Sequence, residues 1–330
     1  MNDSSRKLRA VFLGTPEFAL PSLRAVHGET ELLAVVTQPD RPRGRGRQVA
    51  PPPVAQKARQ LGLRILQPAR LKDADVIQTL RELQPDIIVT VAYGRIIPSE
   101  LLALPPLGCI NVHPSLLPQY RGASPIQAAI AAGERETGVT IMYQTDELDA
   151  GDIILQRRVP IAPDDTAATL EHKLAQVGAE ALVEALRLIA AGDAARSLQD
   201  GARASYVKKL TKEHGRIDWA RPADELERLI RAMNPWPSAF TSHHGKLLKI
   251  WNARATSDHG APGVIHEMRR GEGFVVGTGS GSLVVLEVQP EGGRRMTADE
   301  YVRGYRLNVG EKLGGKIDGS AEARKRGSAI

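Results

Sequence analysis

The feature that most constrains the fold is an alternation of short apolar runs with longer amphipathic segments over the first 190 residues. The runs are rich in β-branched residues and read "LRAVFLG", "ELLAVVTQ", "PDIIVTVAY" and "GCINVHP". The segments between them, such as "PEFALPSLRAVHG" and "PPVAQKARQLG", have the composition of helices. Strands that alternate with helices in this way form a mainly parallel sheet. We therefore predict a doubly wound, Rossmann-like α/β domain.

The end of this domain is predicted at residue 192. "GVTIMYQTDE" and "GDIILQRRVPI" suggest a further pair of strands, and "DDTAATLEHKLAQVGAEALVEALRLIAAG" suggests one long helix that stops at Gly192. Residues 193–206 are small, polar and rich in breakers, which favours a linker. After one helix, residues 207–310 show only short strands with turn signals, so we expect a small antiparallel, OB-like β-barrel. Residues 311–330 lack periodicity and are predicted to be a flexible tail.

Composition narrows the class of protein. A chain of 330 residues suits two domains, and its single cysteine, Cys109, excludes an intramolecular disulfide and any site of several thiolates. Residues 1–10 lead into the first strand without the apolar stretch of a signal peptide, and no run reaches the length of a membrane span. We expect a cytoplasmic monomer that binds no membrane.

The formal charge of +6 is concentrated in the second part of the chain. Residues 1–205 hold 23 Lys and Arg against 23 Asp and Glu, and the remainder holds 21 against 15. Such an asymmetry suits a polyanionic partner such as a nucleic acid, because Lys and Arg that face phosphates release counterions. A mildly basic solvated surface would have the same composition.

Two polar residues interrupt the apolar strand in "CINVHPS". Side chains alternate between the faces of a strand, so Ile110 and Val112 can pack under a helix while Asn111 and His113 share the other face about 7 Å apart. Both precede Pro114 and lie near the carboxyl end of the strand, where open α/β sheets bind ligands. The simpler alternative is that the pair only hydrogen-bonds the loop backbone.

An acidic loop adds a third group. "YQTDELDAGDII" carries Asp146, Glu147, Asp149 and Asp152 around Gly151. Acidic loops are usually solvated turns, but a carboxylate beside His113 would orient the ring and raise its pKa, and an amide with an imidazole can stabilise an oxyanion. Neither a serine elbow nor a reactive cysteine accompanies them. The set indicates acyl transfer without a protein nucleophile.

Two further segments bear on ligands. The first strand leads into "GTPEF", which is neither a dinucleotide fingerprint nor a phosphate-binding loop, so NAD and ATP are not expected; Thr15 is predicted to cap the following helix. The long connection Thr37 to Pro53 places arginine at every second position: Arg41, Arg43, Arg45 and Arg47. It is either a surface loop or an arm that reaches phosphates or base edges.

The motifs together resemble a known family. "GCINVHPSLLPQYRGASPIQ" followed by "LDAGDII" resembles the signature of the folate-dependent formyltransferases, which move a formyl group from 10-formyltetrahydrofolate to an amine. "VFLGTPEFALPSL", "TQPDRPRGRGR", "IVTVAYGRIIP", "RIDW" and "RAMNPWPSAF" are similar to the members that act on methionyl initiator tRNA. The similarity extends to about residue 310.

This resemblance implies specific roles. Asn111, His113 and Asp149 take the catalytic positions, with Asn111 and a protonated His113 holding the oxyanion while Asp149 orients the ring and helps to remove the proton of the amine. No metal is implied. The folate co-substrate would lie against two segments, made up of Val91, Ala92, Tyr93 and Gly94 and of Ser115, Leu116, Leu117 and Pro118.

The resemblance also implies a tRNA surface. The four arginines of the arm would read the acceptor end of initiator tRNA, and the basic barrel would contact its backbone. The alternative within the family is an enzyme that formylates a small amine, such as glycinamide ribonucleotide or an amino sugar. An RNA-binding protein without catalytic activity is the alternative from another class.

Overall fold

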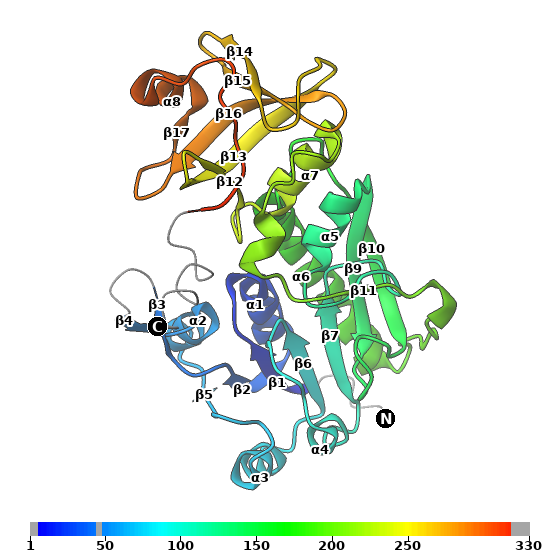
Figure 1. Ribbon diagram of the computed structural model, residues 1–330. Coiled ribbons are helices and arrows are strands. Elements are labelled where there is room, and N and C mark those ends of the chain that lie inside the picture. The colour runs from blue at the N-terminus through cyan, green and yellow to red at the C-terminus, as the bar shows by residue number, and fades with distance from the viewer. Residues whose placement is uncertain (1–5, 44–47, 318–330) are drawn as a thin grey trace, which may run out of the picture. The chain divides into compact units, whose positions relative to one another are not determined.

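A computed structural model describes residues 6–43 and 48–317. Within these residues the chain forms two compact units (Figure 1). The first unit draws on Met1–Pro125, Glu136–Ile161 and Leu170–Lys208, and the second on Ile126–Arg135, Ala162–Thr169 and Lys209–Ile330. None of the described helices is both long and apolar enough to cross a membrane.

The first unit is built on a seven-stranded sheet in the order β10-β9-β7-β6-β1-β2-β5. The five strands from β7 to β5 are mutually parallel, whereas β9 runs antiparallel to both β7 and β10. The prediction of a mainly parallel α/β sheet is therefore confirmed. The strands are β1 (Arg9–Gly14), β2 (Glu31–Val36), β5 (Ile65–Leu66), β6 (Ile87–Val91), β7 (Cys109–His113), β9 (Glu136–Tyr143) and β10 (Ile153–Pro160).

Helices cover both faces of this sheet. On one face, α1 (Leu20–Glu29) and α6 (Ala167–Ala191) are joined by an ion pair between Arg187 and Glu29 at 2.7 Å. Gly178 lets α6 approach the sheet, because a Cβ there would lie 2.9 Å from Cγ1 of Val112. On the other face, α3 (Ala74–Glu82) and α4 (Ser99–Leu102) place Leu80 and Leu101 in a core with strand residues such as Val11 and Ile88.

The strand order creates a switch point between β1 and β6. From β1 the chain continues outward through β2 to β5, and it then returns to β6 on the opposite side of β1. Loops that leave the carboxyl ends of β1 and β6 thus diverge, which is where sheets of this class bind ligands. Thr15 does not cap a helix as predicted, because its hydroxyl donates to the carbonyl of Tyr93, after β6, at 3.0 Å.

The connection Thr37 to Pro53 contains a small hairpin, formed by β3 (Arg41–Arg43) and β4 (Gln48–Ala50). The sequence predicts no secondary structure here, because three-residue strands are too short to show an apolar alternation. Helix α2 (Pro53–Gln60) follows directly. Arg45 and Arg47 lie outside the described residues.

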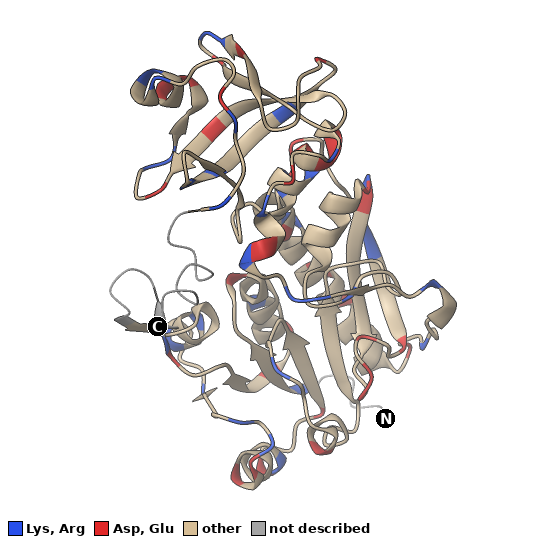
Figure 2. Cartoon of the chain, in the orientation of Figure 1, with Lys and Arg blue, Asp and Glu red and all other residues tan. Residues whose placement is uncertain are grey.

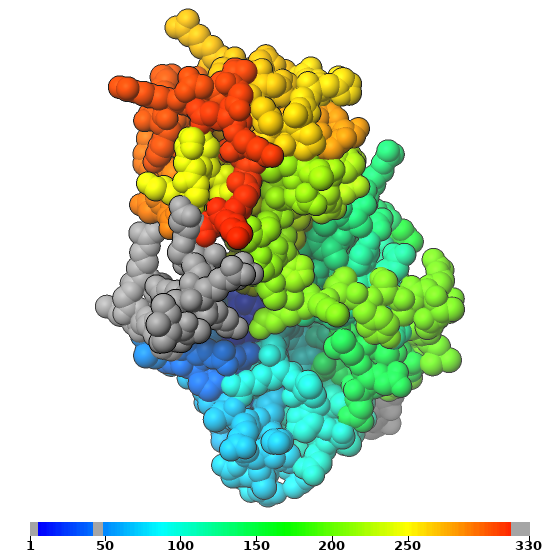
Figure 3. All heavy atoms as spheres, in the orientation of Figure 1, coloured from blue at the N-terminus to red at the C-terminus, as the bar shows by residue number. Residues whose placement is uncertain are grey.

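Residues 193–206 are more ordered than the predicted linker. Ser197 and Ile153 exchange two backbone hydrogen bonds of 2.8 and 3.0 Å, and β11 (Tyr206–Val207) pairs in parallel with β8 (Arg121–Gly122). The 3-10 helix η2 (Gly201–Arg203) lies between them. Figure 3 shows this yellow-green stretch on the surface of the first unit. Backbone pairing fixes the segment, and composition gives no sign of such pairing.

The second unit is a six-stranded antiparallel sheet in the order β12-β13-β16-β15-β14, with β17 paired to β16. The prediction of a smaller antiparallel β unit is confirmed. Thr297 caps α8 in a capping box with Glu300. The elements are α7 (Ala223–Ala232), β12 (Ala239–His243), β13 (Lys246–Thr256), β14 (Ile265–Arg269), β15 (Gly273–Gly277), β16 (Ser282–Pro290), β17 (Met296–Thr297) and α8 (Ala298–Tyr305).

Two short segments join the second unit although the sequence assigns them to the first domain. Within this unit Arg231 donates to the carbonyl of Asp165 at 2.9 Å, and the amide of Ala168 donates to the carbonyl of Asn234. The other segment holds most of α5 (Pro125–Ala132). The remaining short elements are η1 (Glu17–Ala19) and η3 (Lys212–Gly215).

The structure also differs from the predicted boundary at residue 310. Leu313 is buried, and Gly314 exchanges hydrogen bonds with Ser242 of β12. Residues 311–317 therefore pack on the second unit, and two apolar side chains in seven residues, Leu313 and Ile317, were too few to predict this packing. Residues 318–330 of the predicted tail lie outside the described residues.

Candidate active site

Asn111 and His113 lie within the last three residues of β7 and are separated by Val112, as the alternation in the sequence predicts. Ile110 and Val112 are buried in the core, on the opposite face of the strand. His113 is itself only 4% exposed, whereas Asn111 is half-buried. The strand thus presents an imidazole and a carboxamide on one face, next to the carboxyl end of β6.

Asp149 is the member of the acidic loop that reaches His113. Its Oδ2 lies 3.7 Å from Nδ1 of the imidazole and accepts a hydrogen bond of 2.8 Å from the amide of Gly122. The backbone of Asp149 is left-handed, with φ of 49°, a conformation that Asp and Asn tolerate better than most residues. The carboxylate is therefore fixed from both its own backbone and a neighbouring loop.

Two of the other acidic side chains of the loop, those of Asp146 and Asp152, have separate partners. Ser99 donates to Asp146 at 2.5 Å, and Arg196 lies 3.7 Å from Asp152. Asp149 is the carboxylate next to His113 among the candidates that the sequence offered.

The protonation of His113 follows from its surroundings. Nε2 lies 3.0 Å from the carbonyl of Tyr120, which can only accept, so Nε2 carries a proton. Burial lowers the pKa of His113, and the charge of Asp149 and the hydrogen bond to Tyr120 oppose this only in part. The neutral ring therefore prevails at neutral pH, and Nδ1 is left with a lone pair. The protonated ring that the resemblance implies beside the oxyanion would then form during the reaction.

A polar cluster behind Asn111 fixes its carboxamide. The hydroxyl of Thr90, buried in β6, lies 3.0 Å from Oδ1 of Asn111 and 2.8 Å from Oε1 of Gln144. A hydroxyl donates one proton, and here Oδ1 of Asn111 shares it with Oε1 of Gln144 and with the carbonyl of Ile110 at 3.1 Å. When the proton goes to Oδ1, the other end of the carboxamide, the NH₂ group, points away from the cluster. Asn111 can then donate to a ligand.

Sequence reasoning missed Gln199, which holds the loop of Asp149 from the segment expected to be a linker. Its Nε2 donates to the carbonyls of Asp149 and Gly151 at 2.9 and 2.8 Å. Its Oε1 accepts from the buried guanidinium of Arg121 at 2.8 Å. A single glutamine in a polar stretch gives no sequence signal, although Arg121 lies inside the signature segment.

The segment Val91 to Gly94, one of the two expected to border the folate, is a rigid turn after β6. The carbonyl of Tyr93 accepts from both Thr15 and Gln38, at 3.0 and 2.8 Å. The side chains of Val91 and Tyr93 are buried, whereas Ala92 and Gly94 are exposed and left-handed. A ligand can therefore contact the backbone of the turn and the methyl group of Ala92.

The second segment, Ser115 to Pro118, follows the same pattern. Ser115 is fully buried and donates to the carbonyl of Gln119 at 2.7 Å, and Leu117 is also buried. Leu116 and Pro118 are half-buried. Only these last two side chains are available to a ligand.

The arm with the arginines begins at a fixed point. Gln67 donates to both the carbonyl of Gln38 and the carboxylate of Asp40, at 3.0 and 2.7 Å. Arg41 is exposed at the start of β3. Since Gln38 also binds Tyr93, the base of the arm and the turn after β6 share one residue.

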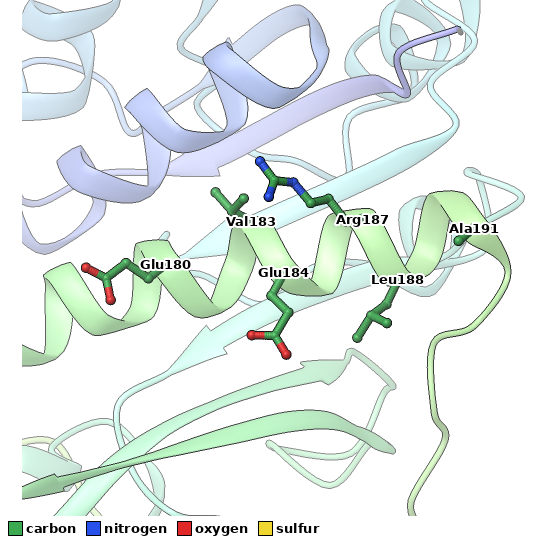
Figure 4. A pocket seen from close by; sticks show the side chains of 6 residues that line it. All are labelled: Glu180, Val183, Glu184, Arg187, Leu188 and Ala191. Carbon is green, nitrogen blue, oxygen red and sulfur yellow. The ribbon is translucent and has the colours of Figure 1, made fainter. Parts of the chain in front are cut away.

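A groove along α6 is a separate feature of the first unit (Figure 4). Its lining comes from that helix alone, and two of its charged side chains already have partners, since Arg187 pairs with Glu29 and Glu184 with Arg157. The groove holds none of the candidate residues. The geometry after β6 and β7 is what offers chemistry: a carboxamide donor, an imidazole lone pair and a carboxylate.

Comparison with known proteins gives matches to both units. The family model described as formyl transferase matches residues 8–186, and the model of the formyl transferase C-terminal domain matches residues 209–306. A methionyl-tRNA formyltransferase of Moorella thermoacetica is 50% identical, with 93% of this chain and 99% of that protein covered. One of Pelotomaculum thermopropionicum is 49% identical over the same shares.

Solved structures of similar fold are more distant in sequence. HypX from Aquifex aeolicus in complex with tetrahydrofolic acid has a TM-score of 0.63 at 21% identity, and 93% of this chain and 49% of that chain are covered. WlaRD, a sugar 3N-formyl transferase solved with dTDP and 5-N-formyl-THF, has a TM-score of 0.64 at 18% identity, over 85% and 98% of the two chains. These likenesses concern the fold.

Proposed function

This chain belongs to the formyl transferase family, and we propose that Asn111, His113 and Asp149 carry out its reaction. The reaction is the transfer of a formyl group from 10-formyltetrahydrofolate to the free amino group of methionyl-initiator tRNA, which gives N-formylmethionyl-tRNA for translation initiation. Relatives of this name cover nearly the whole chain, both units included. The small-amine alternative is disfavoured for that reason.

The folate co-substrate, which supplies the formyl group, fits the two segments after β6 and β7. Their exposed parts are the backbone around Ala92 and Gly94 and the side chains of Leu116 and Pro118, a combination of polar edges and apolar faces that suits a planar heterocycle. A Cβ at Gly94 would lie 2.8 Å from Nε2 of Gln38, so this position admits only glycine without displacing the anchor of the turn. We assign the buried members of both segments to holding the loops.

Asn111 is the donor to the formyl oxygen. Its Oδ1 is engaged by Thr90, so its Nδ2 is free to meet the negative charge that develops on that oxygen when the amine attacks. This carboxamide is the single observation that carries the proposed mechanism, because it places an uncharged donor two residues from His113 at the carboxyl end of β7.

His113 and Asp149 take up the proton of the attacking amine. Nδ1 of the neutral ring has the lone pair to accept it, directly or through a water. The imidazolium that forms stands 3.7 Å from the carboxylate of Asp149, which stabilises it. The positive ring then adds to the charge that favours an anionic oxygen beside Asn111.

The arm and the second unit are the proposed tRNA surfaces. Arg41 is exposed and the arm starts from a fixed base, which favours contact with the acceptor end. In the second unit Figure 2 shows basic and acidic residues interleaved around β17 and α8, where Arg294 pairs with Glu300 and Arg295 with Glu287. Cytoplasmic location and a monomeric state stay predictions.

The function is tested by a formyl-transfer assay with four acceptors in parallel: methionyl initiator tRNA, methionyl elongator tRNA, glycinamide ribonucleotide and a nucleotide-linked amino sugar. We expect product with the initiator tRNA and much less with the other three. Transfer to a small amine, with none to charged initiator tRNA, would contradict the function. A chain that binds initiator tRNA but transfers nothing would indicate the non-catalytic alternative.

Thr90→Val is expected to lower kcat by about three- to tenfold, because one hydrogen bond of roughly 0.5–1.5 kcal/mol no longer holds the carboxamide of Asn111. Valine keeps the shape of threonine and suits a strand. Thr90→Ser retains the hydroxyl and is the matched control. Single-turnover rates at saturating folate give the result, and an unchanged rate in Thr90→Val would show that Asn111 is held by other contacts.

A further inference from the structure

Two histidines and a glutamate lie close together in the second unit, and the proposed mechanism of formyl transfer uses none of them. His243 ends β12, His244 is the first residue of the turn to β13, and Glu311 follows α8. Oε2 of Glu311 lies 2.8 Å from Nε2 of His243 and 3.0 Å from Nε2 of His244. One potential ligand atom from each of the three residues lies within 4.8 Å of those of the other two.

The backbone conformation of the turn between β12 and β13 directs the ring of His244 toward the ring of His243. His244 and Gly245 both have positive φ, 49° and 73°, as a two-residue turn between antiparallel strands requires. Adjacent strand residues would point to opposite faces, but here the two ring centroids are 4.0 Å apart. Histidine, like asparagine and aspartate, is enriched among the non-glycine residues that adopt a left-handed backbone, so the turn accepts His244.

Each of the two inner ligands is oriented by a neighbour. Nδ1 of His243 lies 2.8 Å from the hydroxyl of the buried Tyr301. The second oxygen of Glu311, Oε1, accepts from the amide of Asn308 at 2.8 Å and from its side chain at 3.1 Å. Partners of this kind hold metal-binding histidines and carboxylates in place.

The backbone of Glu311 is fixed as well. Its carbonyl accepts from the amide of Ile265 at the start of β14. The segment that carries the carboxylate is thus tied to β14.

We propose that His243, His244 and Glu311 bind a divalent metal ion such as Zn²⁺. The ligand atoms are Nε2 of each histidine and Oε2 of the glutamate. Imidazole and carboxylate are ligands that Zn²⁺ accepts, at about 2.0–2.2 Å in a tetrahedral arrangement. Those bond lengths place ligand atoms about 3.3 Å from one another, a few tenths of an ångström more than the two hydrogen bonds that join Glu311 to the histidines. The side chain of His244 is 73% exposed, so water completes the fourth position.

The ion would connect the segment after α8 to the turn between β12 and β13. In the bound state Nε2 of His243 is a ligand and its proton resides on Nδ1, where the oxygen of Tyr301 accepts it. The site is independent of formyl transfer, and chelation is expected to leave the chemical step unchanged. Its role is to hold this part of the second unit together.

The test is a calorimetric titration of the chelator-treated full chain with Zn²⁺, together with thermal unfolding and the absorption spectrum of the Co²⁺ form. We expect one ion per chain, a higher Tm with Zn²⁺, and the visible bands of four-coordinate Co²⁺. His244→Asn removes the imidazole but keeps a residue that favours the left-handed turn, and it should weaken binding by about 100-fold, as should Glu311→Gln.

His259→Asn is the matched control, because that histidine is exposed and lies outside the cluster; its affinity should equal that of the unchanged chain. Circular dichroism reports whether each variant folds. Saturable binding that survives both His244→Asn and Glu311→Gln, or no binding beyond that of unspecific surface histidines, would show that the three side chains form only a hydrogen-bonded cluster.

Discussion

Asn111→Asp is expected to lower kcat by about 10²–10³-fold with little change in the KM for 10-formyltetrahydrofolate, the cost of removing one donor to a developing oxyanion. Aspartate has the size of asparagine and can still accept from Thr90 through its Oδ1. It cannot donate, and it adds a negative charge where the formyl oxygen becomes negative. The loss should therefore fall on the transition state, with ground-state binding kept.

The measurement is single-turnover formylation at saturating substrates, with folate affinity determined separately by fluorescence. Gln60→Glu is the matched control, since it makes the same chemical change on an exposed residue of α2. A variant Asn111→Asp with nearly full kcat would contradict the role of the carboxamide. Loss of folate binding in proportion to the loss of rate would assign Asn111 to binding instead.

The sequence was most informative where polar residues interrupt a regular alternation of apolar residues. Ile110 and Val112 follow the two-residue period of a buried strand. This period alone predicts that Asn111 and His113 share the other face, without knowledge of the residues that contact them. The sheet, the long helix that ends at Ala191 and the second antiparallel unit follow from periodic runs in the same way. Such patterns are local, and one window of sequence contains them.

What the sequence could not predict depends on contacts between distant residues. Gln199 reaches Asp149 across 50 positions, and Thr90 reaches Gln144 across 54. Each is a single polar residue whose meaning depends on its partner. A nearby carboxylate was expected to raise the pKa of His113, and Asp149 does so, but burial lowers that pKa more, and the depth of burial depends on the packing of several elements.

The segments assigned to a linker and a tail illustrate the same limit. Residues 193–206 look like a flexible connection by composition, yet two backbone hydrogen bonds between Ser197 and Ile153 and the pairing of β11 with β8 hold them. Backbone groups pair whatever side chains they carry, so a polar composition does not exclude order. Gln199 acquires its position through this backbone pairing.

Asp149→Asn is expected to reduce the rate of formyl transfer by about 10²-fold or more and to lower the pKa of His113 below its value in the unchanged chain. The carboxylate raises that pKa against the effect of burial, so its removal leaves burial unopposed. The imidazolium that forms as the amine loses its proton then has no counter-ion. Asparagine keeps an acceptor for the amide of Gly122 and tolerates the left-handed backbone.

The sign of the pH effect separates this role from a structural one. A neutral His113 is needed to accept the proton, so activity that depends on it falls as the pH drops through its pKa, and in Asp149→Asn this fall must move to lower pH. NMR titration of the eight histidines, with the His113 signal assigned from His113→Gln, measures the pKa directly. Asp146→Asn in the same loop is the control and should change neither rate nor titration. A His113 pKa that rises or stays constant in Asp149→Asn would mean that the carboxylate only supports the loop.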